Sequence, residues 1–327
     1  MATVFSGMQP TGEVHLGNYL GAVSRWVRDQ AQDQYFCVVD LHAITIPIDP
    51  QVLRARGIDL ATWWLAAGLN PDVCTIFVQS QVREHSELAW ILNCVASMGE
   101  LNRMTQFKDK AEGKDFVSVG LFGYPVLQAA DILLYHTEEV PVGADQRQHI
   151  ELARDIAQRF NGRFGDTFTL PKAVFPASGA RIMDLQNPDN KMSKSADSPQ
   201  GTVLLAEDEA VTRKKIMRAV TDSGAEVRAT PVPEKQAVAN LLDMLSAVTG
   251  SSVEALEQEF DGKGYGDFKG ALADAVNDYL RPVRERYTEL KNDPGAVEAM
   301  LRKGAEKARE VAGTTMATVR ERVGLSA

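Results

Sequence analysis

The hydrophobic positions in the first two hundred residues alternate between two patterns. Strand-length runs of β-branched and aromatic residues occupy positions 3–5, 35–39 and 75–79. The last two are almost continuously apolar, which is typical of strands buried on both faces. Residues 18–31 and 50–67 between them repeat apolar side chains at helical spacing, and Asp49-Pro50 supplies a cap and a first-turn proline to the second helix. The alternation predicts an α/β fold, a doubly wound, Rossmann-like parallel sheet.

From about residue 204 the pattern becomes purely helical. Apolar residues recur at helical spacing over positions 211–220, 233–249, 252–260, 267–290 and 294–323, separated by segments such as TGSS and NDPG. The sequence therefore predicts two domains, an α/β domain over 1–195 and an all-helical domain over 196–327. The Ser-, Pro- and Gly-containing stretch 193–201 is the expected linker.

Composition and charge narrow the class of protein. A hydrophobic fraction of 44% excludes a disordered chain, and no apolar run is long enough for a membrane span. The net charge of −9 is spread over both predicted domains, so a nucleic-acid partner would have to be bound by local basic clusters. Cys37, Cys74 and Cys94 lack metal-ligand or disulfide spacing and predict reduced, buried residues of a cytoplasmic protein without a secretory signal.

A glycine-rich segment, GMQPTGEVHLGN at 7–18, directly follows the first predicted strand. Its glycines allow a close approach of the backbone to a ligand, and the following helix would present its N-terminal N–H groups to a phosphate. His15 and Asn18 are three residues apart and would project from one face of the first turn. A plain strand–turn–helix corner remains the alternative, because the spacing fits neither a dinucleotide fingerprint nor a phosphate loop.

A second segment, KMSKS at 191–195, lies between the predicted domains. Two lysines and two serines within five residues supply ammonium and hydroxyl donors suited to an oligophosphate. The alternative is a solvated linker.

Taken together and in this order, the two segments resemble the HIGH and KMSKS signatures of the class I aminoacyl-tRNA synthetases. The resemblance is closest to the bacterial tryptophanyl branch and extends over nearly the whole chain, through VVDLHAIT, GELNRMTQFKDK, YPVLQAADILLY, VPVGADQRQHIELARDIAQRFN, GARIMDL, KKIMRAVTDS and GAEKA. The chain departs from the common pattern at Ala144, where an acidic residue is expected, and at Arg147, where lysine is expected.

The resemblance implies activation of L-tryptophan by ATP and its transfer to tRNA(Trp). Such a reaction needs positioning and charge stabilisation rather than covalent catalysis. The implied catalytic residues are His15, Asn18, Lys191 and Lys194, although His15 could serve only as a helix cap. The implied ATP-binding residues are Gln9, Pro10, Thr11, Gly17, Asn18, Gly143, Ala144, Asp145, Ile182, Lys191, Met192, Ser193, Lys194 and Ser195. Lys110 is a further candidate phosphate contact, and the alternative is that its side chain is simply solvated. Mg²⁺ would be held mainly by the ATP phosphates.

The implied amino-acid pocket centres on Asp131, a carboxylate within the apolar run QAADILLY. By the resemblance, Asp131 accepts the indole N–H of tryptophan, and an amino acid without that N–H would leave its hydrogen bond unmade. The alternative is a buried structural carboxylate paired with an arginine. The remaining implied pocket residues are Phe5, His42, Tyr124, Gln128, Val140, Val142 and Gln146; Tyr124 and the valines could also be plain core.

The densest basic cluster is formed by Arg213, Lys214, Lys215 and Arg218. A solvated helix face is the default interpretation, and the resemblance makes it a candidate tRNA phosphate contact. The resemblance further implies anticodon binding by 196–327, an insertion and dimer region at about 100–140, and a homodimer without membrane association.

Three alternatives remain open from the sequence. A tyrosyl-tRNA synthetase shares both signatures, but Asp131 and the GADQRQH segment favour tryptophan. A pantothenate-synthetase-like adenylating enzyme would lack the helical domain. A non-catalytic synthetase-like paralogue is disfavoured by the retained His15, Asp131, Lys191 and Lys194.

Overall fold

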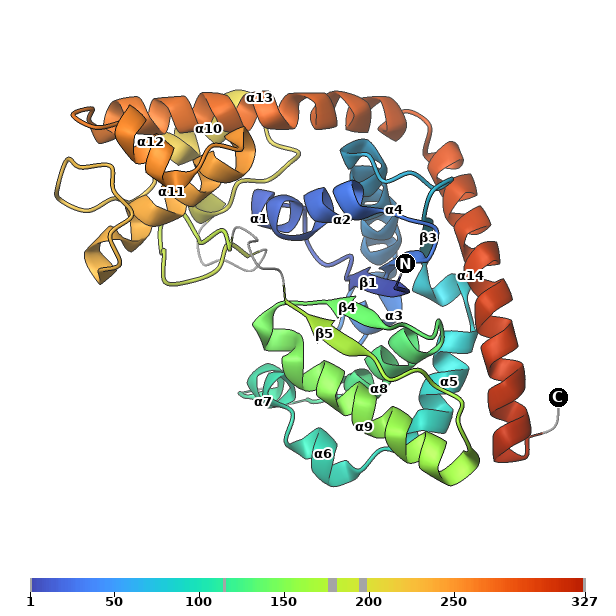
Figure 1. Ribbon diagram of the computed structural model, residues 1–327. Coiled ribbons are helices and arrows are strands. Elements are labelled where there is room, and N and C mark those ends of the chain that lie inside the picture. The colour runs from blue at the N-terminus through green and yellow to red at the C-terminus, as the bar shows by residue number, and fades with distance from the viewer. Residues whose placement is uncertain (1, 114–115, 176–180, 194–198, 326–327) are drawn as a thin grey trace.

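A five-stranded parallel sheet forms the centre of the molecule (Figure 1). The computed structural model describes residues 2–113, 116–175, 181–193 and 199–325. The strands follow the order β3-β2-β1-β4-β5, so the chain moves outward on one side of β1 and later continues on the other. Their bounds are β1 Val4–Met8, β2 Gln34–Val38, β3 Thr75–Val78, β4 Glu139–Pro141 and β5 Lys172–Val174. The predicted doubly wound parallel sheet is confirmed.

Alternate residues of the central strands enter two different hydrophobic clusters. Phe36, Val38 and Ile76 pack on one face of the sheet, whereas Cys37 and Phe77 pack on the other. Successive side chains of a strand point to opposite faces, so a strand covered on both sides must be apolar throughout. This explains the continuous apolar runs from which β2 and β3 were predicted.

Helices cover both faces of the sheet (Figure 1). On one side lie α1 (Leu16–Asn18), a π-helical turn (Tyr19–Val23), α2 (Ser24–Asp29) and α4 (Pro50–Ala67). Short α3 (Asp40–Ala43) follows β2. The other side carries α5 (Glu84–Asn93), α6 (Met98–Asn102), α7 (Thr105–Ala111), α8 (Val119–Leu133) and α9 (Arg147–Phe164). Asp49 caps α4 through Oδ1, as its sequence predicts.

The helical part of the chain comprises α10 (Glu209–Met217), α11 (Gln236–Thr249), α12 (Val253–Glu259), α13 (Tyr265–Lys291) and α14 (Pro294–Val323). In Figure 1, α13 spans from the α10–α12 group to the sheet domain, and α14 turns back along the β3 edge. Gly304 makes this docking possible, because a Cβ at that position would lie 1.8 Å from the Ile76 carbonyl oxygen. The late GAEKA segment is thus the place where a helix touches a strand backbone.

The placement of α14 bears on the proposed domain division at residue 195. The division stays a prediction, but the last helix of the segment 196–327 packs against β3 and α5 of the first domain. Of the cysteines expected to be buried, Cys37 and Cys74 are buried and Cys94 is exposed. That expectation was wrong for Cys94 because it caps the end of α5 at the surface. No helix in the described ranges has the length and apolarity needed to cross a membrane.

Candidate active site

A cavity of about 360 Å³ opens beside the carboxyl ends of β1 and β4. The strand order reverses between these two strands, which is where open α/β sheets bind their ligands. The tryptophan-site candidates from the sequence all line this cavity: Phe5, His42, Tyr124, Gln128, Asp131, Val140, Val142 and Gln146. The cavity also takes in residues that the sequence did not indicate, namely Ser6, Ala22, Trp26, Val39, Gln106, Ile132 and Pro141.

Asp131 is the charged group at the bottom of this cavity. Its side chain projects from α8 and the residue is only 1% exposed. Oδ2 lies 2.8 Å from His42 Nε2, and Oδ1 lies 2.6 Å from both Gln79 Nε2 and His85 Nδ1. Burial alone would raise the pKa of Asp131, but the hydrogen bonds from His42 and His85 outweigh it and hold the pKa well below its usual range. The site therefore contains a buried carboxylate that stays ionised.

These partners differ from the arginine that the sequence left open as an alternative. Asp131 is paired with two histidines and a glutamine, not with an arginine. Gln79 and His85 were missed because one ends an apolar strand run and the other lies inside a helix. A polar residue directly after a buried strand, at the carboxyl edge, is the signal that could have identified Gln79.

A second part of the cavity lining is built around Tyr124, on the same helix as Asp131. Its hydroxyl lies 2.9 Å from His149 Nε2, and the Lys110 ammonium lies 4.6 Å from the centre of its ring. Burial raises the pKa of Tyr124 to about 12 and lowers the pKa of His149 to about 4. Both groups are therefore neutral at pH 7, and Lys110 contributes a positive charge at the entrance of the cavity.

The depressed pKa of His149 predicts a stability that depends on pH. In the unfolded chain the imidazole takes up a proton near pH 6.5 and in the folded chain only near pH 4, so its contribution is full above pH 6.5 and lost toward pH 4. The shift corresponds to about 3 kcal/mol. We expect urea unfolding of wild type and His149→Gln, measured from pH 7 to pH 4, to diverge by an amount of this order. A stability difference between the two that does not vary with pH would contradict the prediction.

A polar turn borders the cavity between β4 and α9. Asp145 Oδ2 accepts from Gln146 Nε2 at 2.8 Å and from Gln106 Nε2 at 3.1 Å. A Cβ at Gly143 would lie 2.7 Å from Asp145 Oδ1, so glycine lets this carboxylate fold back over the turn. Gln128 Nε2 donates to Gln146 Oε1 at 3.4 Å and so joins this hydrogen-bond network. Ala144 and Arg147, the two departures from the expected pattern, are both exposed beside it.

The first signature begins a short helix rather than presenting a free imidazole. His15 Nδ1 accepts from Asn18 N at 3.3 Å, and Asn18 Oδ1 accepts from His15 N at 3.4 Å, so the two residues form a reciprocal cap on α1. The capping role that the sequence left open for His15 is therefore present, and its imidazole is 3% exposed. Of the other candidates in this segment, Gln9 lines the cavity, Pro10 is buried and Thr11 is half-buried.

The structure brings the two signatures into contact. A Cβ on Gly17 would lie 3.5 Å from Met192 Cβ and only 3.1 Å from His15 Nδ1, so glycine is needed where they meet. Val14 and Leu16 also pair with the segment that follows the second signature, through Leu205 N to Val14 O and Leu16 N to Val203 O. Segments far apart in the sequence thus form one surface.

The second signature is described for Lys191, Met192 and Ser193. Met192 N donates to the Ile182 carbonyl, and Lys191 pairs with Met183 in an isolated bridge. Lys191 is exposed, whereas Met192 and Ile182 are buried. Lys194 and Ser195, two of the residues expected to bind phosphate, lie outside the described residues.

The basic cluster on α10 is not a uniform surface. Lys215 is 6% exposed, and its Nζ donates to Thr202 O at 2.7 Å and to Glu207 Oε2 at 2.5 Å. Its assignment as a tRNA contact was wrong, because its ammonium is committed to a buried ion pair. Lys214 and Arg218 are exposed, and Arg213 is exposed but paired with Asp274. Arg218 lies just beyond the end of α10.

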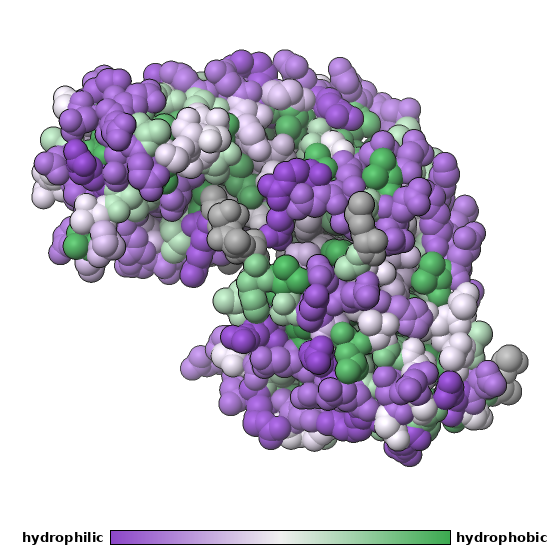
Figure 2. Space-filling model, viewed as in Figure 1, coloured by the Kyte–Doolittle hydropathy of each residue, from purple (hydrophilic) through white to green (hydrophobic). Residues whose placement is uncertain are grey.

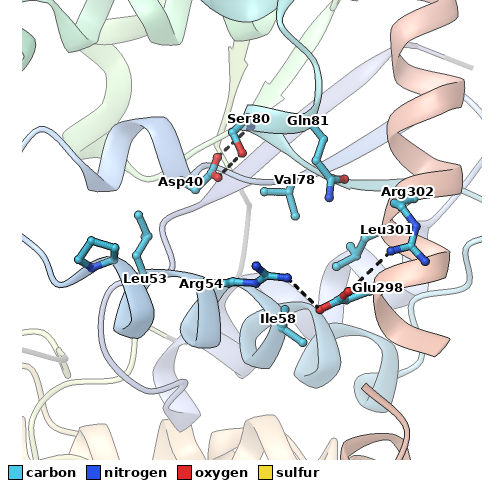
Figure 3. Close-up of a pocket in the computed structure, with 12 residues that line it drawn as sticks. Asp40, Leu53, Arg54, Ile58, Val78, Ser80, Gln81, Glu298, Leu301 and Arg302 are labelled. Atoms are coloured by element: carbon cyan, nitrogen blue, oxygen red, sulfur yellow. Dashed lines mark hydrogen bonds and ion pairs between the residues drawn. The ribbon is translucent and has the colours of Figure 1, made fainter. Parts of the chain in front are cut away.

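A second cavity, of about 370 Å³, lies between α4, the end of β3 and α14 (Figure 3). Glu298 stands between Arg54 at 3.8 Å and Arg302 at 3.6 Å, and Asp40 accepts from the Ser80 backbone and hydroxyl on the other side. Because its lining residues include no site candidate from the sequence and neither signature, we do not regard it as the reaction site.

Comparison with known proteins shows the family of the chain. The family model of tRNA synthetases class I (W and Y) matches residues 1–281. The chain belongs to this family. Its relatives include Tryptophan--tRNA ligase 2 of Streptomyces avermitilis, which is 53% identical over 325 residues, covering 98% of this chain and 96% of that protein. The resemblance inferred from the two signatures is therefore confirmed.

Solved structures of the family agree with this fold. Tryptophanyl-tRNA synthetase from Mycoplasma pneumoniae superposes with a TM-score of 0.91 at 37% identity, covering 100% of this chain and 98% of that one. The Campylobacter jejuni enzyme, complexed with ADP and tryptophan, gives a TM-score of 0.84 at 37% identity, covering 98% and 99%. The comparisons favour the tryptophanyl branch over the tyrosyl one.

Proposed function

We propose that this protein is a tryptophan--tRNA ligase that forms tryptophanyl-adenylate from L-tryptophan and ATP and transfers the tryptophanyl group to tRNA(Trp). The observation that carries the proposal is the ionised Asp131 at the bottom of an aromatic-sized cavity, whose walls include Phe5 and Tyr124. A buried anion that can only accept hydrogen bonds selects an amino acid whose side chain donates one. The indole N–H of tryptophan meets this requirement.

The chain contributes positioning and charge to this reaction. The substrate carboxylate attacks the α-phosphorus of ATP, the bond to the bridging oxygen breaks, and pyrophosphate leaves with its electron pair. ATP would lie along the joined signatures, with the Gly17 backbone against it and Asn18 and Lys191 as donors. The Asp145 turn would meet the ribose. ATP enters as its Mg²⁺ complex, with the ion held by the phosphates.

ATP–pyrophosphate exchange with single amino acids tests the assignment. We expect exchange with tryptophan and a rate at least a hundredfold lower with tyrosine or phenylalanine. Phenylalanine has no side-chain donor, and the hydroxyl of tyrosine donates from a different position than the indole N–H. Equal exchange with tyrosine would favour the tyrosyl alternative. Absence of exchange with all twenty amino acids would favour a non-catalytic paralogue.

The helical segment supports the transfer step. The segment 196–327 would bind the anticodon arm, and exposed Lys214 and Arg218 would contact tRNA phosphates. Figure 2 shows the surface hollowed between this helical part, at the upper left, and the sheet domain. A cytoplasmic location fits this function.

An exposed apolar surface on α5 and α8 supports a homodimer. Trp90 is 72% and Val119 is 85% exposed, and the two helices pack against each other. Phe116, Met98 and Ile44 are exposed apolar residues in the neighbouring segments. Exposed apolar side chains gathered on one surface are typical of a contact with another protein chain. It overlaps the region of about residues 100–140 in which the family resemblance implies a dimer contact.

Charge introduced into this surface should dissociate the dimer. We expect wild type to sediment as a dimer and Trp90→Glu/Val119→Glu to sediment as a monomer at micromolar concentration. Val211→Glu, at an exposed valine on α10, serves as the matched control and should remain dimeric. A monomeric wild type, or a dimeric double variant, would contradict this interface.

A further inference from the structure

Asp131 belongs to a buried chain of polar groups that extends away from the cavity. Oδ1 receives hydrogen bonds from Gln79 and His85, and Oδ2 receives one from His42. Asp131 and His42 line the cavity, whereas Gln79 and His85 do not. Oδ1 is thus the inner oxygen and Oδ2 the outer one.

The orientation of the Gln79 side-chain amide is fixed by a hydrogen bond from the backbone. Its Oε1 accepts the backbone N–H of Leu41 at 3.1 Å, so its NH₂ group must face Asp131. Gln79 is fully buried and has no solvent with which to exchange either bond.

The tautomer of His85 is fixed in the same manner. Nδ1 faces a carboxylate oxygen, which only accepts, so Nδ1 carries the hydrogen. Nε2 lies 2.8 Å from the Tyr135 hydroxyl, and within the described part of the chain that hydroxyl has no other hydrogen-bond partner. With no other described partner, the Tyr135 hydroxyl donates its hydrogen to Nε2. In this arrangement Nδ1 of His85 donates and Nε2 accepts.

We propose that Gln79, His85 and Tyr135 are positioning residues that occupy Asp131 Oδ1 with donors, so that Oδ2 is the acceptor presented to the indole N–H. The inference rests on the proposed function of the cavity. A carboxylate oxygen accepts about two hydrogen bonds, and Oδ1 already has two. These donors fix the rotation of the Asp131 carboxylate. Because every neighbour of its two oxygens donates a hydrogen bond, a protonated Asp131 would direct its own hydrogen at another N–H. Selectivity for an N–H substrate thus depends on groups that never touch it.

The test compares tryptophan with the analogue in which sulfur replaces the indole N–H. The ratio of their kcat/KM values in pyrophosphate exchange measures recognition of that hydrogen alone. We expect Gln79→Met to lower the ratio about tenfold. Tyr135→Phe removes a hydroxyl that is linked to Asp131 through two successive hydrogen bonds, and it should lower the ratio about threefold. The kcat of the analogue should be nearly unchanged in both variants. Gln81→Met, in the same turn as Gln79, and Tyr35→Phe, whose ring stacks on Tyr135, are matched controls that should keep the ratio.

A second measurement is independent of activity. The ¹⁵N spectrum of histidine-labelled protein should show His85, assigned by its loss in His85→Gln, as the neutral Nδ1–H tautomer. A ratio unchanged in both Gln79→Met and Tyr135→Phe, an equal loss for both substrates, or an Nε2–H or cationic His85 would overturn the inference. A wild type that fails to prefer tryptophan over the analogue would instead refute the proposed function.

Discussion

Lys191→Ala should lower the rate of tryptophan activation by about 10²–10³-fold, the effect of removing one donor aimed at charge that develops in a transition state. Lys191 is exposed, but its backbone is held on both sides, by the hydrogen bond from Met192 N to Ile182 O and by the one from Asp184 N to Asn190 O. The adjacent Met192 packs against Gly17 of the first signature. The ammonium therefore extends from the surface where the two signatures meet.

The rate should be measured in a single turnover, together with tryptophan affinity. An interaction made mainly as pyrophosphate leaves changes the rate much more than ground-state binding. Lys303→Ala, at an exposed lysine of α14, removes one positive charge far from the signatures and should leave the rate unchanged. A loss of tryptophan affinity that matches the loss in rate would show that Lys191 supports the pocket rather than the leaving group.

The parts of the fold that the sequence predicted well are those with long, regular patterns. The bounds of α4 and α14 coincide with the predicted ranges 50–67 and 294–323, because each begins at a proline behind an aspartate cap and ends before a glycine. The strands β4 and β5 were not predicted. Each is three residues long and β4 includes Pro141, so neither has enough apolar residues to form a pattern.

The residues of the candidate site also fall into those that the sequence indicated and those that only the structure revealed. The resemblance supplied residues that share a cavity, but the groups behind Asp131 could not be predicted because they come from three different elements. Gln79 follows β3, His85 lies on α5, and Tyr135 follows α8. Lys215 is the opposite case, a residue that the sequence indicated and the structure shows to be buried. Its sequence neighbours suggested a solvated basic face, and only the fold reveals that Glu207 and Thr202 enclose it.

The strongest test of the pocket is Asp131→Asn, for which we expect the kcat/KM for tryptophan to fall by about one to two orders of magnitude. An asparagine has one oxygen where Asp131 has two. With its oxygen inward, its NH₂ group would face His42 and the indole N–H; with its oxygen outward, its NH₂ group would face Gln79 and His85. Either arrangement sets donor against donor in a buried site.

The analogue with sulfur in place of the indole N–H separates recognition from general damage. It makes no hydrogen bond to Asp131 in either protein, so Asp131→Asn should lower its exchange much less than that of tryptophan. Exchange kinetics of both substrates in both proteins give a coupling energy, expected to be about 1.5–3 kcal/mol. Equal losses for the two substrates, with a coupling energy near zero, would mean that Asp131 organises the cavity without reading the indole nitrogen. Specificity for tryptophan would then have to arise from the shape of the cavity walls around Phe5 and Tyr124.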